Sequence, residues 1–339
     1  MDQLQPPARW SVAVNEATWI AERLGPFGAA VTSVVPAGFA AYARVLHPAE
    51  DPRHGHRLVR WNEVAAWSGL PLHPDAQFHT VALPPTRPAA PAPWSGQGPH
   101  AGSLYPPDAE VLAEVLRGRT TTPEECFFAI WDGYGWGGTL LSTPGTPPVT
   151  LPDSVPAAAR RGPRLRLPGR DYLLYTGPVE AITASVDIGD CQTANLAWPK
   201  DRAWCVASEI DLAWSYVAGS ASLVGRLLDE PRIEALPAGP DDPLTRVEPF
   251  VASLVSRAVD EVLANGHAVI STSRGTVDVS LERPTRWRAG ALRVRTKRDD
   301  TSSGEGWSSG GLGPVKSREE LRRGAERRLT MSVVELVGG

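Results

Sequence analysis

The sequence predicts an α+β protein that has a tryptophan-rich mixed sheet domain with helices and a smaller C-terminal α-β-β-β-α domain. Three observations predict this class. Short strands with two apolar faces alternate with amphipathic helices in the central part of the chain. Stretches rich in proline and glycine divide the chain. The charge also changes sign, because residues 1–242 hold 18 basic and 26 acidic residues whereas residues 243–339 hold 16 basic and 12 acidic ones.

These divisions predict four segments. Residues 1–83 form an N-terminal α+β segment, and residues 84–102 form a proline-rich loop or linker. Residues 103–238 form the central sheet domain, and residues 245–339 form the basic C-terminal domain. An acidic body with a basic final domain suggests that the two have different partners or dock on each other.

The composition is that of a soluble globular protein with a real core, and the strong preference for arginine over lysine suggests a GC-rich bacterial coding bias. Its three cysteines have no metal-ligand spacing and are expected to be reduced thiols in a cytoplasm. No secretory pattern begins the chain, and Pro36 and Gly38 interrupt its most apolar long segment. We expect a cytoplasmic protein that has no membrane span, no cofactor and no metal.

In the N-terminal segment, the pattern predicts a helix from Glu16 to Leu24, strands over Ala30–Val35 and Phe39–Leu46, and a short helix over Asn62–Ser68. The next predicted helix covers Pro107–Arg117, because proline at its start, acidic residues in its first turn and a following glycine are typical helix signals.

The central strand begins at Cys126 in the stretch CFFAIWDGYGWGG. Alternation places Cys126, Phe128 and Ile130 on one face of the strand. The other face holds Phe127, Ala129 and Trp131, and because both faces are apolar the strand should be covered on both sides. Further strands are predicted over Tyr172–Thr176, Ala203–Ile210 and Tyr216–Ala218, and Ser220 should cap the helix that follows.

The C-terminal domain begins with a capping box at Thr245 and a long amphipathic helix that ends at Asn265. A hairpin over Ala268–Glu282 and a strand around Leu292 follow. Ser302–Gly313 reads as a loop rich in glycine and serine, and a last helix begins near Ser317.

Acidic side chains follow two of the central strands. Asp132 ends the first strand, and Glu209 and Asp211 lie at the end of another. If the two strands run in the same direction, these acids meet at one edge of the sheet. Carboxylates that converge near a pocket could act as acid and base in a hydrolase. The alternative is an acidic strand end whose carboxylates are solvated or hydrogen-bonded.

Aromatic side chains lie close to both strand ends in the sequence. Tryptophan is common in protein cores and is also enriched in recognition patches. The candidate binding residues are Tyr134, Trp136, Trp198 and Trp214.

Two other patterns are weak. The glycines of GYGWGG match a dinucleotide motif, but the residues after them cannot form the helix that such a site needs, so a tight turn is favoured. His47, His54 and His56 lie near two acids and could bind a metal, although the prolines around them favour a solvated loop.

A family resemblance covers residues from Leu104 to Ala238. The segments TPEECFFAIWDGYGW, LPGRDYLLYTGPVEA and WPKDRAWCVASEIDLAWSYVAGSASLVGRLL resemble a set of bacterial proteins that have no assigned activity. More distantly, strands followed by a closing helix are similar to the SUKH superfamily, whose members often act as immunity proteins against toxins. This resemblance implies protein binding rather than catalysis.

The C-terminal order of elements resembles that of double-stranded RNA-binding domains, which bind phosphates with lysines at the start of the last helix. The corresponding basic residues here are Lys316, Arg318, Arg322 and Arg323, without the lysine-pair pattern of that family. A non-enzymatic protein-binding module, of the immunity type that the SUKH resemblance implies, is therefore the first expectation. A hydrolase that uses the three acids and an RNA binder that uses the basic domain remain the alternatives.

Overall fold

The computed structural model describes residues 8–82, 90–94, 98–134, 138–140, 149–151, 155, 157–183, 186–187, 191–244, 249–272, 275–282, 291–298, 306–311, 322, 325–326 and 329. The chain divides into two compact units. The first contains residues 1–62, 72–75 and 99–244, and the second contains residues 63–71, 76–98 and 245–339. The α+β class is confirmed, since both units combine helices with a sheet.

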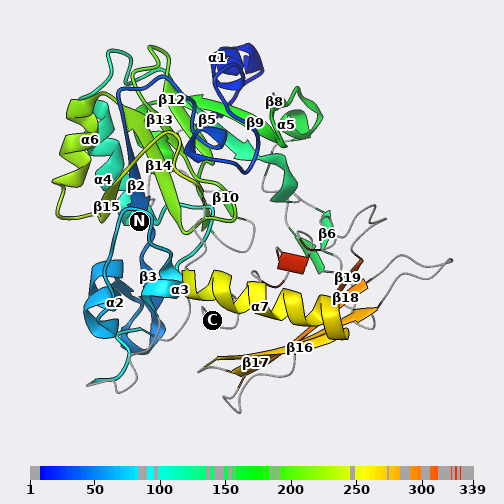
Figure 1. The fold of residues 1–339 in the computed structure, drawn as a ribbon. Coiled ribbons are helices and arrows are strands. Elements are labelled where there is room, and N and C mark those ends of the chain that lie inside the picture. Colours follow the sequence, from blue (N-terminus) through cyan, green and yellow to red (C-terminus); the bar gives the residue numbers. More distant parts are fainter. Residues whose placement is uncertain are drawn as a thin grey trace. The chain divides into compact units, whose positions relative to one another are not determined.

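A nine-stranded sheet forms the centre of the first unit (Figure 1). Its strand order is β1-β9-β5-β12-β13-β14-β2-β15, and β8 also pairs with β9. Every pairing in this sheet is antiparallel, so the prediction of a mixed sheet was wrong. Its strands are β1 (Arg9–Trp10), β2 (Ala41–Leu46), β5 (Cys126–Trp131), β8 (Leu165–Leu167), β9 (Arg170–Gly177), β12 (Leu196–Pro199), β13 (Cys205–Ala207), β14 (Trp214–Gly219) and β15 (Ala235–Ala238).

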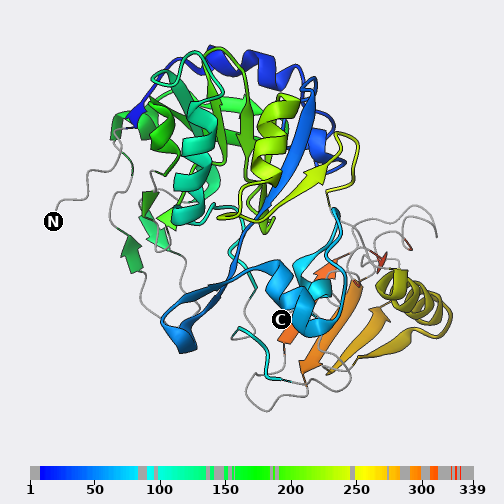
Figure 2. The same cartoon turned by 90° about the vertical axis from the view of Figure 1, so that its left-hand side faces the viewer.

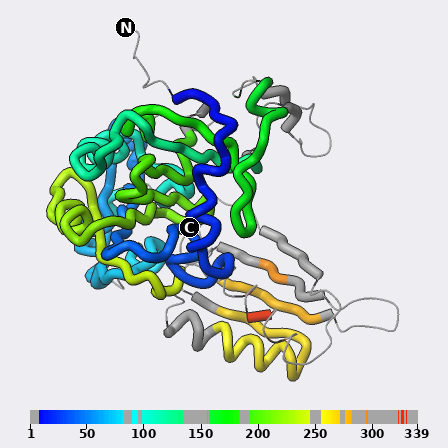
Figure 3. Tube along the Cα trace, turned by 90° about the horizontal axis from the view of Figure 1, so that it is seen from above, coloured from blue at the N-terminus to red at the C-terminus, as the bar shows by residue number. Residues whose placement is uncertain are grey.

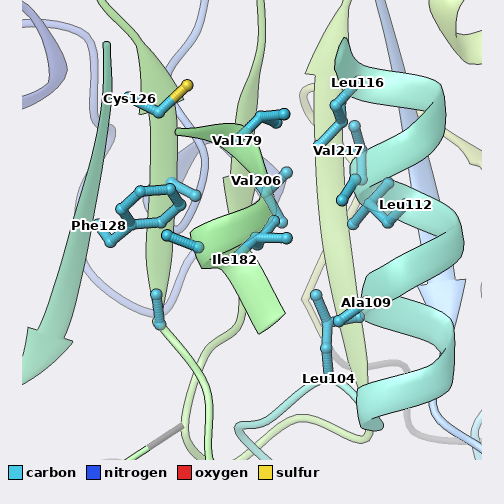
Figure 4. Close-up of a cluster of buried hydrophobic side chains, with 14 of the residues drawn as sticks. Leu104, Ala109, Leu112, Leu116, Cys126, Phe128, Val179, Ile182, Val206 and Val217 are labelled. Carbon is cyan, nitrogen blue, oxygen red and sulfur yellow. The ribbon is translucent and has the colours of Figure 1, made fainter. Parts of the chain in front are cut away.

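Helices cover one face of this sheet. Helices α4 (Pro106–Arg117) and α6 (Ala221–Leu228) lie side by side over it (Figure 2), and the 3-10 turn η5 (Val179–Thr183) packs beside them. The buried side chains between these layers form one cluster (Figure 4) that includes Cys126, Phe128 and Ile130, the face that alternation predicted. Ser220 Oγ accepts a hydrogen bond from the backbone of Leu223 and caps α6, as predicted.

The other face of the sheet is aromatic. Register places Phe127 directly opposite Trp198, and their rings stack with centroids 5.5 Å apart. Along the same face, the guanidinium of Arg44 lies 4.0 Å from the ring centroid of Trp214. The N-terminal region contributes the buried Trp19 to this unit through α1 (Thr18–Ala21), which is shorter than the predicted helix.

One strand predicted for the N-terminal segment, Ala30–Val35, differs from the structure. Val31–Ser33 is the 3-10 turn η2 rather than a strand. Its backbone N–H groups bind carbonyls of the segment after β15, because Val31 donates to Asp242 and Thr32 donates to Pro240. That Pro/Gly/Asp segment is therefore attached to the first unit, and the division between the units follows Leu244.

The remaining elements of the first unit are small. Three two-stranded sheets pair β3 (Ala49–Asp51) with β4 (Arg57–Val59), β6 (Gly138–Leu140) with β7 (Val149–Leu151), and β10 (Val186–Asp187) with β11 (Cys191–Gln192). The other short elements are the helix α5 (Ala157–Arg161) and the 3-10 turns η1 (Val14–Ala17), η3 (Pro52–His54) and η4 (Asp132–Tyr134).

The second unit is a helix on a sheet (Figure 3). Helix α7 (Pro249–Asn265) packs on a four-stranded antiparallel sheet with the strands β16 (His267–Thr272), β17 (Gly275–Glu282), β18 (Ala291–Arg298) and β19 (Gly306–Gly311). The strand β19 lies where the sequence predicted a loop. Helix α3 (Phe78–Val81) and most of α2 (Trp61–Ser68) belong to this unit.

Candidate functional site

The two acid-bearing strands end at the same edge of the sheet. Strands β5 and β13 are both antiparallel to β12, which lies between them, so they run in the same direction. Asp132 directly follows β5, and Glu209 follows β13 by two residues. The sequence-based expectation that these acids share an edge is thus met, although through an antiparallel sheet with an intervening strand.

Arg170 organises this edge. It begins β9, the neighbour of β5, and register places it on the same face as Trp131. Its guanidinium carbon lies 5.0 Å from the ring centroid of Trp131 and 5.3 Å from that of Phe27. Phe27 comes from the N-terminal region and has 53% of its surface exposed. Two aromatic rings therefore hold one arginine, which is a favourable cation–π arrangement.

Two glycines make room for these rings. A Cβ atom on Gly133 would lie 2.0 Å from Cζ2 of Trp131, so the indole packs directly on the backbone of the turn after β5. Gly169 has a φ of +81°, and a Cβ atom there would lie 2.6 Å from Cδ2 of Phe27. Gly133 therefore serves close aromatic packing within the short 3-10 turn η4, and the next described element after that turn is the strand β6. We call Trp131, Arg170 and Phe27, with these two glycines, the arginine stack.

Carboxylates fix the arginine within the stack. Glu209 accepts hydrogen bonds from Nε and Nη2 of Arg170, and Oδ2 of Asp211 lies 3.5 Å from Nη2. Burial alone would lower the pKa of Arg170, but the hydrogen bond and the charge of Glu209 outweigh it and raise that pKa. Glu209 is largely covered, whereas 80% of the Asp211 side chain is exposed.

Asp132 is paired with a different arginine. Nε of Arg164 donates to Oδ2 of Asp132 over 2.8 Å. The other donors of that guanidinium bind the carbonyl oxygens of Ala159, Arg160 and Gly162, at the end of helix α5. Arg164 thus attaches the end of α5 to the end of β5. The three candidate carboxylates are divided between two arginines, which is an arrangement for holding structure in place.

The open space at this edge is shallow. Its lining comes from the ends of β5 and β8 and the start of β9: Trp131, Asp132, Gly133, Leu167, Gly169, Arg170 and Asp171. A second, partly enclosed cavity of about 20 Å3 is lined in part by Asn195, Ser208 and Glu209. That volume is enough for one water molecule and not for an organic substrate.

A buried amide joins the strands behind the arginine stack. Oδ1 of Asn195 accepts the backbone N–H of Trp131 at 2.9 Å, and its Nδ2 donates to the carbonyl of Ser208 at 3.0 Å. One side chain therefore fixes the ends of both acid-bearing strands. Sequence reasoning missed Asn195, Arg170 and Phe27; the polar run QTAN before β12 was the one local signal for a buried network.

A histidine and two serines form a second buried network. Nδ1 of His47 donates to the carbonyl of His100 at 2.8 Å, and its Nε2 accepts from Oγ of Ser215 at 2.9 Å. Ser215 also bonds Oγ of Ser208 at 2.5 Å. Burial lowers the pKa of His47 to about 4, so this histidine is neutral. The pairing resembles a nucleophile and its base, but all three side chains are buried in the core.

The histidines do not form a metal site. His47 is in the core, whereas His54 binds Asp51 and His56 binds Glu50 at the surface. Across the residues that the structure describes, no three histidine, cysteine, aspartate or glutamate side chains gather as metal ligands.

The predicted aromatic surface differs from the observed one. Trp198 and Trp214 are 1% and 3% exposed, so they are core residues and the prediction that they bind a partner was wrong. They pack with other rings on the aromatic face, which alternation alone could not distinguish from an open surface. The side chains of Tyr134 and Trp136 lie outside the described residues.

The basic C-terminal candidates are described in part. Arg322 binds Asp260 and Glu326, so its charge is shared with two acids of its own unit. Lys316, Arg318 and Arg323 lie outside the described residues.

No family model matches the chain, and neither a curated protein nor a solved structure matches it. Within the ranges that the structure describes, no helix is long and apolar enough to cross a membrane.

Proposed function

We propose that the protein is a non-enzymatic protein-binding module that holds its partner at the edge of the sheet where β5 and β13 end and β9 begins. The observation that carries this proposal is the exposed ring of Phe27, which lies on a largely covered arginine that a second ring and a carboxylate hold in place. Tryptophan and arginine dominate the energetic centres of protein interfaces, and rigid anchors lose little entropy on binding.

The carboxylates favour binding over hydrolysis. A hydrolase with two acidic residues needs one protonated carboxyl group and one free base beside the scissile bond. Here Glu209 and Asp132 each accept hydrogen bonds from a guanidinium, and the space in front of them is shallow. An immunity-type role, which the resemblance to the SUKH superfamily implies, is one form of such binding.

The experiment uses a partner recovered by affinity purification and then purified. Its affinity is measured for the wild-type protein, for Phe27→Ala and for Val12→Ala. Val12 is the matched control, because it is also an apolar side chain of the first unit and is 61% exposed. We expect Phe27→Ala to weaken binding by about 10-fold or more, the loss that is typical of an interface hot spot. Equal affinities of the two variants would contradict the proposal.

A further inference from the structure

The edge that carries the arginine stack has a surplus of negative charge. Its acids are Asp132, Asp171, Glu209 and Asp211. Three arginines balance three of them, because Arg164 binds Asp132, Arg170 binds Glu209, and register places Arg166 directly opposite Asp171. The fourth acid, Asp211, is exposed and shares Arg170 with Glu209.

The surplus charge lies beside the exposed ring. Arg170 has Phe27 on one side at 5.3 Å and contacts Asp211 at 3.5 Å, so the ring and the carboxylate flank the same guanidinium. A cation that stacks on a phenyl ring is stabilised by the ring, and a carboxylate within reach adds an ion pair. Phe27 already packs against one guanidinium, which shows that its surroundings accept that group.

We infer that this edge binds a positively charged side chain of the partner, an arginine or a lysine, which stacks on the exposed part of Phe27 and pairs with Asp211. This inference rests on the proposed function. The rest of the unit supports it, since residues 1–62, 72–75 and 99–244 hold 25 acidic and 17 basic residues and would attract a basic partner over a distance.

A partner carboxylate is the opposite possibility, and the geometry disfavours it. Glu209 already occupies the Nε and Nη2 side of Arg170, and Asp211 lies beside Nη2. An incoming carboxylate would meet both acids at close range, where like charges repel.

The test selects binders from a library of random displayed peptides with the full-length protein. The selected peptides are then synthesised and titrated against the wild-type protein, Phe27→Ala and Asp211→Asn. The control is Asp229→Asn, which removes an exposed acid of the same unit away from the arginine stack. Asp211 is 80% exposed, so its substitution should leave the fold intact, as a thermal melt would verify.

We expect the selected peptides to be enriched in arginine or lysine. Their affinity should fall about 10-fold in Phe27→Ala and in Asp211→Asn, remain unchanged in Asp229→Asn, and decrease with added salt. Two results would overturn the inference without contradicting the proposed function. The first is peptides that depend on Phe27 but contain no basic residue, and the second is peptides that bind Asp211→Asn as tightly as the wild type. Peptides that ignore Phe27, or the recovery of no peptide, would count against both proposals.

Discussion

Arg170 shows how one residue can be decisive without any signal in the local sequence. Its contacts come from Phe27 and Glu209, which lie far from it along the chain. Hydrophobic periodicity predicts a strand from Tyr172, two residues after Arg170, and says nothing about which ring or acid Arg170 meets. Asp132, Glu209 and Asp211 could be identified as candidates, because an acid directly after an apolar strand is visible in the sequence. The sequence could not predict that Arg164 and Arg170 divide these three acids between them.

Gly133 is the residue on which the packing of Trp131 depends. A Cβ atom there would overlap the indole at 2.0 Å, so Gly133→Ala must displace the ring and disturb the arginine stack. We expect a loss of about 1–3 kcal/mol in the free energy of unfolding, measured by chemical denaturation. The control is Gly118→Ala, where no atom lies within 4 Å of the added Cβ and φ is negative. Equal stability of the two variants would show that Trp131 is not tightly packed.

Because His47 is buried and neutral, we expect the free energy of unfolding to depend on pH. Burial lowers its pKa from 6.5 to about 4. Between these values the unfolded chain binds a proton that the folded chain does not, so stability is fully present above pH 6.5 and is lost as the pH falls toward 4. The loss amounts to roughly 3 kcal/mol.

Unfolding free energies of the wild type and of His47→Gln between pH 4 and pH 7 check this. The variant should be less stable at pH 7 and should also show a shallower slope. His79, whose pKa burial also lowers to about 4, contributes the same trend in both proteins and cancels in the comparison. Parallel pH profiles would mean that His47 does not contribute.

At the scale of elements, amphipathic helices were the easiest to predict. Helix α4 matches its prediction to within one residue, and the cap of α6 at Ser220 is observed. Local sequence was sufficient there, because periodicity and capping act within a few residues. The strand β19 and the 3-10 turn η2 were missed, since tertiary hydrogen bonds decide their conformation: β19 pairs with β18, and η2 binds the segment after β15.

The edge of the sheet depends on how the strands pair. Asn195 connects the ends of β5 and β13 through hydrogen bonds to Trp131 and Ser208. Asn195→Ala leaves a buried donor and a buried acceptor without these bonds, so we expect it to destabilise the protein by about 1–3 kcal/mol. Asn15→Ala is the control, because Asn15 is exposed and should change stability by no more than about 0.5 kcal/mol. A neutral effect of Asn195→Ala in denaturant titrations would rule out this connecting role.

At the scale of the whole molecule, the order of segments along the chain does not match the division into units. The sequence suggested successive domains, but β2 pairs with β14 and β15 within one sheet, so residues on both sides of the proline-rich stretch build the first unit. Residues 63–71 and 76–98 belong instead with the C-terminal residues from Thr245. Composition shows where the charge and the proline and glycine content change along the chain. It does not show which strands, far apart in the sequence, pair with each other.

The central claim is that a partner binds at the arginine stack, and amide hydrogen exchange tests it most directly. Exchange of the full-length wild-type protein is compared with and without the partner recovered by affinity purification. We predict slower exchange at residues 131–133, 169–171 and 209–211, because these backbone segments surround Arg170 and Phe27. Protection confined to other segments, such as the turn at 199–203 that follows β12, with no change around Arg170, would contradict the account.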